Sequence, residues 1–248
     1  MDLVSVIIPY FKKRNFVRET LTSVTNQSYD NLEILIVYDD TNLNDYEFLQ
    51  KLSKKDSRIK IIKNSTKLGA GFSRNIGIER SNGKYIAFLD ADDTWSPDKL
   101  KSQISFMKQN NYKVSHTSYY ILDEKKKLIG YRKARDLLSL NDILKSCDIG
   151  LSTVVLEKNV VIHNKIKFPK LATKEDFVFW LMLLKKDYRF YAYDKYLTNW
   201  SDVKNSLSSS TVQKLNDGFK VYNQYMDFNI FKSLYYLLCL SFNYLKKK

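Results

Sequence analysis

The chain has 248 residues, of which 44% are apolar and 14% aromatic, and this composition supplies a sizeable core and excludes an intrinsically disordered protein. Lysine and arginine outnumber the acidic residues by 41 to 27, but the basic residues are scattered along the chain, which argues against a nucleic-acid partner. The resulting net charge of +14 suits an anionic substrate or an anionic membrane surface, although biased lysine usage would give the same charge.

The cysteines and the N-terminal residues indicate in which cellular compartment the protein is expected. The two cysteines, Cys147 and Cys239, form neither a metal-ligand spacing nor a disulfide framework, which fits a reducing cytoplasm. The N-terminus enters a strand directly, without a basic n-region or a small-residue cleavage site. We therefore expect a cytoplasmic protein without a signal peptide.

The first half of the chain alternates apolar runs typical of buried strands with amphipathic helical patterns. The expected strands are residues 3–10, 32–37, 58–63 and 85–89, and the expected helices are residues 16–27, 45–54 and 72–80. A further helix is expected after Ser96 and Pro97, as an N-cap followed by proline at the first helical position. This alternation predicts an α/β fold with a mostly parallel, doubly wound sheet.

Acidic residues follow two of the expected strands. Asp39 and Asp40 come after residues 32–37, and Asp90, Asp92 and Asp93 come after the strand that ends at Leu89. Repeated strand–helix units place the carboxyl ends of parallel strands on one edge of the sheet, where open α/β sheets bind ligands. These acids are therefore expected to meet in one cleft, the alternative being two ordinary solvated turns.

The pattern changes after Met107. Residues 113–122 and 128–132 are expected strands joined by a turn, and therefore antiparallel. The expected elements that follow are a short helix near residues 139–146, a strand at 154–157, a helix opening at Thr173, an aromatic strand at 188–197 and a polar loop at 201–210.

Residues 229–248 are apolar and aromatic and end in three lysines. Their strongest apolar run, residues 234–245, is too short for a membrane-spanning helix, which needs about 20 residues. Two interpretations stay open. One is an interfacial helix with apolar and tyrosine side chains in a membrane, and the other is a C-terminal helix packed on the core.

Five short motifs stand in a fixed order along the chain. They are V-S-V-I-I-P-Y at residues 4–10, I-V-Y-D-D at 36–40, S-R-N-I-G at 73–77, F-L-D-A-D-D at 88–93 and E-D-x-x-x-W at 175–180. Together they resemble the successive signatures of family 2 glycosyltransferases. The resemblance implies the GT-A fold and inverting transfer of a sugar from a nucleotide-diphosphate donor.

On this resemblance we expect three regions. Residues 1–112 would form the nucleotide-sugar-binding half of the GT-A domain, and residues 113–212 a smaller mixed half that binds the acceptor and carries the catalytic base. Residues 213–248 would form a helical tail, either membrane-associated or packed on the core. The oligomeric state is not indicated.

The leaving diphosphate sets the first chemical requirement. Mn²⁺ or Mg²⁺ is typically held by one or two carboxylates plus the substrate's phosphates, a share that Asp92 and Asp90 would supply. Asp92 is the preferred metal ligand, and Asp90 is expected nearer the ribose. Asp93 could be a ligand, a contact to the donor sugar or a cap for the turn at Ser96.

The resemblance also implies the rest of the donor site. Pro9, Tyr10 and Asp40 would frame the base, uracil or another, beside Asp39. Arg74 is placed where its guanidinium could reach the diphosphate in bidentate fashion. The alternative for Arg74 is an ion pair with Glu79 or another neighbour on the helix surface.

The second requirement is a base for the acceptor hydroxyl, and by resemblance Asp176 takes this role, with Glu175 second. Thr173 and Asp176 are also spaced almost as a capping box, and a helix N-terminus would keep Asp176 ionised at neutral pH.

Weaker indications concern the acceptor site. Ser152 and Thr153 are candidate acceptor contacts, and Trp180 is either a sugar platform or a core residue. The lone histidines, His116 and His163, are interpreted as structural.

The favoured function is a metal-dependent inverting glycosyltransferase that moves a sugar, from UDP for preference, to a hydroxyl of a glycan or lipid-linked acceptor. Surface-polysaccharide assembly at the inner face of the cytoplasmic membrane would be its setting. One rival is a sugar nucleotidyltransferase, but the loop at residues 11–15 lacks the glycines of a phosphate-binding loop. The other is a non-catalytic carbohydrate- or lipid-binding subunit, against which the retained acids argue.

Overall fold

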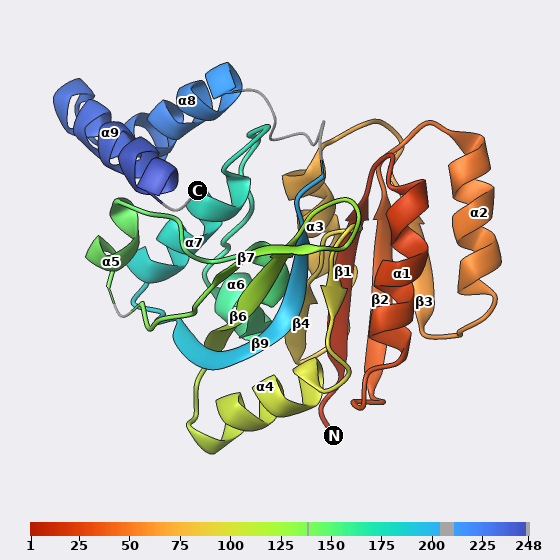
Figure 1. Ribbon diagram of the computed structural model, residues 1–248. Helices are drawn as coiled ribbons and strands as arrows, with labels where there is room; N and C mark the ends of the chain where they lie inside the picture. The colour runs from red at the N-terminus through yellow and green to blue at the C-terminus, as the bar shows by residue number, and fades with distance from the viewer. Residues whose placement is uncertain (138, 204–210, 247–248) are drawn as a thin grey trace.

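The computed structural model describes residues 1–137, 139–203 and 211–246 (Figure 1). Its strands are β1 (Val4–Tyr10), β2 (Leu32–Tyr38), β3 (Ile59–Lys63), β4 (Tyr85–Phe88), β5 (Thr94–Trp95), β6 (Val114–Leu122), β7 (Leu128–Arg132), β8 (Val155–Glu157) and β9 (Tyr191–Ser201). Its helices are α1 (Arg14–Thr25), α2 (Leu43–Ser53), α3 (Ala70–Arg80), α4 (Lys99–Gln109), α5 (Asn141–Leu144), α6 (Lys158–His163), α7 (Glu175–Lys185), α8 (Thr211–Lys220) and α9 (Ile230–Lys246), with a 3-10 turn at Leu151–Thr153 and a π-helical turn at Val221–Tyr225.

Within this described part the strands form one nine-stranded sheet, in the order β3-β2-β1-β4-β8-β6-β9-β5, with β7 paired to β6. The first four strands in this order are parallel, as the alternating strand–helix pattern predicts. From β8 onward the sheet is mixed, because β8 runs antiparallel to both β4 and β6 while β9 is parallel to β6. The mixed half is therefore a continuation of the same sheet.

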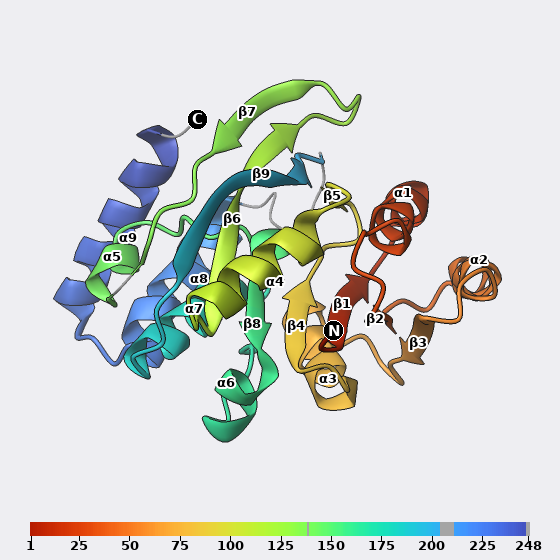
Figure 2. The same cartoon turned by 90° about the horizontal axis from the view of Figure 1, so that it is seen from below.

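Helices cover both faces of the sheet, and Figure 2 shows α1 and α4 on one side with α3 and α6 on the other. Side chains alternate along β1, so that Val6 and Ile8 pack into one apolar cluster with α1 and α4. Ile7 packs into the opposite cluster, which α7 enters with Phe177. This agrees with the expected GT-A architecture.

Gly77, the last residue of the S-R-N-I-G motif, lies where helix α3 packs closely on strand β1. A Cβ at this position would lie 2.4 Å from Cγ2 of Ile7, so only glycine lets α3 approach β1 this closely. Arg74 lies one turn earlier on the same helix, and the close packing fixes its distance from the end of the sheet.

The predicted start of α4 is wrong. Thr94 and Trp95 pair with β9, the amide of Ser96 donates to the carbonyl of Leu197 at 3.0 Å, and Asp98 takes the N-cap position expected for Ser96. The helix begins two residues after Pro97, at Lys99. A two-residue strand carries no periodic signal, so its competing pairing could not be seen in the sequence.

Two further expectations concern the end of the chain. The expected polar loop begins at Ser201, which belongs to β9 and is buried, and the part of that loop at residues 204–210 lies outside the described residues. Helix α9 packs on the core through Leu240 and through Tyr236, whose ring stacks on Tyr222. None of the helices in the described ranges is long and apolar enough to span a membrane.

Candidate active site

A pocket of about 1110 Å³ opens at the carboxyl ends of β1, β2 and β4. Nine of the residues singled out from the sequence line it: Pro9, Tyr10, Asp39, Arg74, Asp90, Asp92, Asp93, Glu175 and Asp176. The structure therefore brings Asp39, which follows β2, together with Asp90, Asp92 and Asp93, which follow β4, as predicted. Four others are absent from its lining: Asp40, Ser152, Thr153 and Trp180.

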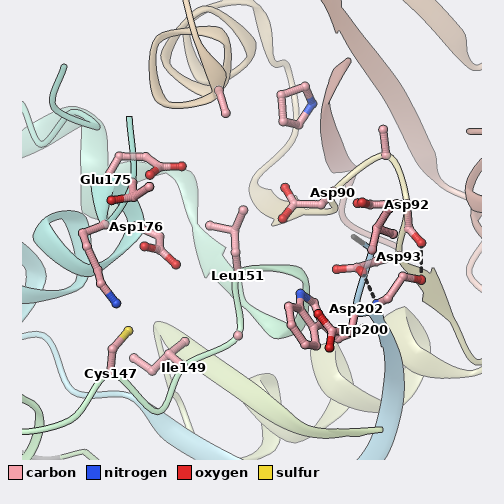
Figure 3. Close-up of a pocket in the computed structure, with 18 of the residues that line it drawn as sticks. Asp90, Asp92, Asp93, Cys147, Ile149, Leu151, Glu175, Asp176, Trp200 and Asp202 are labelled. Carbon is pink, nitrogen blue, oxygen red and sulfur yellow. Dashed lines mark hydrogen bonds between the residues drawn. The ribbon is translucent and has the colours of Figure 1, made fainter. Parts of the chain in front are cut away.

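The segment after β4 carries the acids of the F-L-D-A-D-D motif. The backbone amide of Asp90 donates to the hydroxyl of Ser152 at 3.0 Å, and the amide of Asp93 closes a turn by donating to the carbonyl of Asp90 at 3.0 Å. The Asp90 side chain is 33% exposed and that of Asp92 is 15% exposed. Both carboxylates can therefore be reached from the pocket (Figure 3).

Asp92 forms an ion pair with Lys13, which precedes α1. Burial raises the pKa of Asp92, the charge of Lys13 opposes that rise, and the neighbouring carboxylate of Asp90 adds to it. Desolvation thus outweighs the stabilisation of the ionised form that Lys13 provides, and the net pKa of Asp92 is raised.

Asp93 differs from its two neighbours because its side chain is almost fully buried. One carboxylate oxygen accepts from the hydroxyl of Ser152 and the other from the amide of Ser201 at 2.9 Å. Burial raises its pKa well above the ordinary value, and the charges of Asp92 and Asp90 raise it further. Asp93 ties β9 and the 3-10 turn to the acidic segment, and its carboxylate bonds Ser152 and Ser201 in place of the Ser96 turn that the sequence suggested.

Arg74 connects the acidic segment to helix α7. Its guanidinium donates to Asp90 at 2.7 Å and to Glu175 at 2.8 Å, and its side chain is 5% exposed. Burial lowers the pKa of Arg74, but the two carboxylates outweigh that effect and raise it. The alternative pair with Glu79 does not form, since Glu79 bonds Lys167 at 2.8 Å. Arg74 therefore fixes the position of Asp90 relative to the start of α7.

Asp176 reaches the pocket from the first turn of α7, across from Asp90 (Figure 3). Its Oδ1 accepts from the amide of Phe177 at 2.7 Å. The capping box does not form, because Lys174 takes the N-cap position with φ 66° and Thr173 donates instead to Asp217 of α8. Asp217 lies 44 residues farther along the chain, so local spacing could not reveal this competing partner.

The electrostatics of Asp176 also differ from expectation. Burial raises its pKa, and the charges of Lys174 and Arg74 oppose the rise without cancelling it. The predicted stabilisation of the anion by the helix N-terminus is therefore outweighed by desolvation.

Comparisons with known proteins agree with this geometry. The family described as Glycosyl transferase family 2 matches residues 5–168, about two thirds of the chain. The chain belongs to glycosyl transferase family 2. It is accordingly a glycosyltransferase with the GT-A fold.

Two relatives of this glycosyltransferase match along nearly their whole length. TuaG of Bacillus subtilis, whose name assigns it to teichuronic acid biosynthesis, is 32% identical over 99% of this chain and 97% of its own. The UDP-Glc:alpha-D-GlcNAc-diphosphoundecaprenol beta-1,3-glucosyltransferase WfgD of Escherichia coli is 34% identical over 95% and 91%.

Solved structures show the same fold. The S. aureus TarS fragment 1–349 in complex with UDP-GlcNAc superimposes with a TM-score of 0.73 at 20% identity, over 91% of this chain. This chain spans 65% of that fragment's length. The mannosyltransferase PcManGT of Pyrobaculum calidifontis, in complex with GDP-Man and Mn²⁺, has a TM-score of 0.70 at 12% identity, over 94% of this chain and 69% of its own.

The aromatic residue expected to contact a base, Tyr10, differs from expectation. The Tyr10 side chain is fully buried, stacks on Tyr38 and donates its hydroxyl to Asp45 at 2.7 Å, so it offers no ring to a base. Phe11, the next residue, also lines the pocket, with the ammonium of Lys67 4.0 Å from its ring centroid. Both residues lie in loops, where no periodicity could identify them.

The two acids after β2 bond backbone amides. Asp39 accepts from the amides of Leu68 and Gly69 at 2.8 and 2.7 Å, and so joins β2 to the turn before α3. Asp40 accepts from the amides of Lys12 and Thr41 at 3.1 and 2.7 Å. The predicted direct contact of Asp40 with a base is not supported, because Asp40 is absent from the pocket lining.

Three side chains that the sequence suggested for the acceptor, Trp180, Ser152 and Thr153, are buried. Trp180 has no exposed surface and lies in the apolar cluster behind the pocket, so it cannot be a sugar platform. Ser152 and Thr153 are also buried. The hydroxyl of Ser152 accepts from the amide of Asp90 and donates to the carboxylate of Asp93, and so holds the acidic segment in place. The side chains that do line this half include Ile149, Leu151 and Trp200 (Figure 3).

The interpretation of the two histidines as structural agrees with their places. His116 is buried in β6, where Nε2 lies 2.9 Å from the carbonyl oxygen of Arg135. His163 ends the short helix α6, and neither histidine lines the pocket.

Proposed function

We propose that this glycosyltransferase is a metal-dependent inverting enzyme that transfers a sugar from a nucleotide diphosphate to a hydroxyl of a lipid-linked or glycan acceptor. The observation that carries the proposal is the placement of Asp90 and Asp92 on one side of a single pocket with Asp176 on the other. Such a site separates stabilisation of the leaving diphosphate from deprotonation of the acceptor.

The donor set fits Mn²⁺ or Mg²⁺. Asp92 and Asp90 offer two reachable carboxylates, and Lys13 already compensates one of them with a positive charge. Cations of this kind are commonly held by one or two carboxylates plus substrate phosphates. When bound, the cation would act as a Lewis acid on the leaving diphosphate.

Asp176 is proposed as the base that accepts the proton of the attacking acceptor hydroxyl. Its raised pKa makes it a stronger base than an ordinary aspartate. Glu175, in contrast, is held by Arg74 at 2.8 Å and has less freedom to take a proton. We therefore assign Glu175 to positioning: through Arg74, it fixes Asp90 and the start of α7.

The donor is proposed to be a UDP-sugar. WfgD is named for UDP-Glc, and the TarS structure contains UDP-GlcNAc. Phe11 and Lys67 would contact the base or ribose at the β1–β2 end of the pocket, near Pro9 and Asp39. Lys13 would pair with the diphosphate once the cation takes over Asp92.

The acceptor is proposed to be lipid-linked, because WfgD is named for a GlcNAc-diphosphoundecaprenol acceptor, and the setting to be cell-surface polysaccharide assembly, because TuaG is named for teichuronic acid biosynthesis. The exposed face of α9 supports work at the inner face of the cytoplasmic membrane. Its apolar residues recur on one side of the helix: Phe231, Leu234, Tyr235, Leu238, Phe242 and Leu245. Lys232 and Lys246 on the same helix would meet anionic headgroups.

The proposal is tested with Asp92→Asn, assayed for transfer and for donor hydrolysis with Mn²⁺ and with EDTA. Loss of the metal ligand is expected to lower turnover at least roughly 100-fold, because the Lewis acid supplies several kcal/mol. Asp98→Asn is the matched control, since Asp98 lies in the next turn and bonds Ser28 at 2.6 Å outside the pocket. Turnover that persists in EDTA, or in Asp92→Asn, would contradict the proposal.

A further inference from the structure

Trp200 is the exposed one of the three tryptophans in the chain. Trp95 and Trp180 are 4% and 0% exposed, whereas Trp200 is 38% exposed and lines the pocket. Tryptophan side chains are highly buried on average, so an indole left open to a pocket calls for an explanation. Trp200 also stacks on no other aromatic ring in the described part of the chain.

The strand around Trp200 is fixed to the acidic segment. The amide of Ser201 donates to Asp93 at 2.9 Å, and its hydroxyl donates to the backbone carbonyl of Asp92 at 2.6 Å. Two residues before Trp200, the hydroxyl of Thr198 donates to the carbonyl of Ser152 at 3.3 Å. The indole is therefore held on rigid backbone next to the proposed metal ligands, as Figure 3 shows.

Trp200, Ile121 and Gly130 are paired side by side across strands β9, β6 and β7. Ile121 of β6 pairs with Trp200 on one side and with Gly130 of β7 on the other, and all three line the pocket. Gly130 brings no side chain to the row, and a Cβ there would already contact Cδ1 of Ile121 at 3.5 Å. The row therefore forms an apolar platform beside Asp202, whose carboxylate also lines the pocket.

The two ends of the pocket are formed by different strands of the sheet. Pro9 lies near the end of β1 and Asp39 follows β2, whereas Trp200 lies on β9. In the strand order, β4, which precedes the acidic segment, is between them. A donor with its base near β1 and its diphosphate at Asp90 and Asp92 leaves the β9 side for the other substrate.

We propose that Trp200 binds the terminal sugar of the acceptor, with the apolar face of the pyranose against the indole and Asp202 accepting from a sugar hydroxyl. This inference rests on the proposed function. The chemistry suits a sugar, whose ring presents C–H groups to the negative face of the indole and hydroxyls to a carboxylate. It assigns to Trp200 the role that Trp180 cannot have.

The first test uses the intrinsic fluorescence of the wild-type protein. Because Trp95 and Trp180 are buried, acrylamide quenching reports mainly on Trp200. The probes are decyl diphosphate carrying N-acetylglucosamine and decyl diphosphate without sugar, each with UDP and Mn²⁺ present. Protection from quenching by the sugar-bearing probe alone is expected. Equal protection by both probes, or protection by neither, would overturn the inference.

The second test measures transfer kinetics with the same sugar-bearing probe and UDP-sugar donors. Trp200→Ala is expected to lower kcat/KM for the acceptor roughly 10- to 100-fold, as truncation of a buried aromatic contact does, while Trp200→Phe retains most of it. Donor hydrolysis should stay within about twofold of wild type, because the proposal assigns the indole to the acceptor and places the base of the donor at the opposite end of the pocket.

Tyr120→Ala is the matched control, because Tyr120 is 37% exposed on the neighbouring strand, next to Ile121, and does not line the pocket. If wild type transfers sugar and Trp200→Ala does so equally well, this inference is wrong and the proposed function stands. If wild type neither transfers nor hydrolyses any donor, the proposed function itself fails.

Discussion

Asp176 is the residue on which the proposed chemistry depends most directly. Asp176→Asn removes the proton acceptor but keeps the size of the side chain and its bond to the amide of Phe177. Transfer is expected to fall roughly 10²- to 10⁴-fold, the usual contribution of a general base, with donor affinity unchanged. Turnover assays with isothermal titration of UDP and Mn²⁺ measure both quantities. A near-normal rate in Asp176→Asn would show that another group takes the proton.

Glu175→Gln is the informative comparison for that variant. It leaves the carboxylate of Asp176 in place but weakens the ion pair with Arg74. A positioning role predicts a smaller loss of rate than in Asp176→Asn. The opposite order would exchange the two assignments.

His116 gives a pH-dependent contribution to stability. Burial lowers the pKa of His116 to about 4 from 6.5, so the folded state disfavours the protonated ring. Stability from this residue is present above the unfolded pKa and is lost as pH falls from 6.5 toward 4. Between about pH 7 and pH 5 the loss should be about 2 kcal/mol, at 1.36 kcal/mol per pKa unit.

Urea unfolding of wild type and His116→Gln at both pH values checks this expectation. Glutamine has no charge to gain, so the difference in unfolding free energy between the two proteins should shrink at the lower pH. His163→Gln controls for the other histidine, which ends α6 and is exposed. An unchanged difference would mean that the pKa of His116 is the same in the folded and in the unfolded protein.

For single residues, the sequence could predict that acids at the ends of different strands lie close together, because parallel strands place their carboxyl ends at one edge of the sheet. The edge on which Asp39, Asp90 and Asp92 meet follows from parallel strands alone. The two tryptophans could not be told apart, because Trp180 sits on a helix with apolar residues all round and Trp200 on an aromatic strand. Their exposure depends on which surfaces pack together in three dimensions.

Among the elements, the strand–helix units of the first half were visible because each carries its own apolar period. The order β4-β8-β6-β9-β5 was not, since these pairings join segments far apart in the chain. For example, Thr94 of the short strand β5 pairs with Asn199 of β9. Strand pairing at that separation leaves no mark in local composition.

Helix α9 leads to a prediction about membranes. Leu238 and Phe242 are 70% and 60% exposed on the apolar stripe, so Leu238→Asn with Phe242→Asn should leave the fold intact. Binding to phosphatidylglycerol vesicles is expected to fall at least roughly 10-fold, because burying each side chain is worth about 1.5–3 kcal/mol. Cosedimentation with vesicles measures the change.

Val212→Asn is the control, because Val212 is 78% exposed on α8 and lies outside the stripe of α9. Vesicle binding should survive in this variant. If the double variant binds as well as wild type, or if wild type ignores the vesicles, α9 does not attach this protein to a membrane.

For the whole molecule, the single sheet explains how two chemical tasks share one pocket. Its parallel half positions the groups assigned to the donor, and its mixed half positions those assigned to the acceptor. Arg74 on α3 and Glu175 on α7 join the two halves across the pocket at 2.8 Å. A ligand that fills the pocket therefore contacts both halves at once.

This arrangement predicts that the donor and its cation stabilise the folded protein together. At 100 times its dissociation constant a ligand adds roughly 2.7 kcal/mol, which for a chain of this size raises Tm by roughly 5–10 °C. UDP-sugars with Mn²⁺ should give this shift, and the same sugars in EDTA a much smaller one, because the diphosphate then faces Asp90 and Asp92 without a cation. GDP-mannose with Mn²⁺ should give a smaller shift than UDP-glucose. A larger shift with GDP-mannose would reject UDP as the preferred nucleotide, and equal shifts in EDTA and Mn²⁺ would reject the metal.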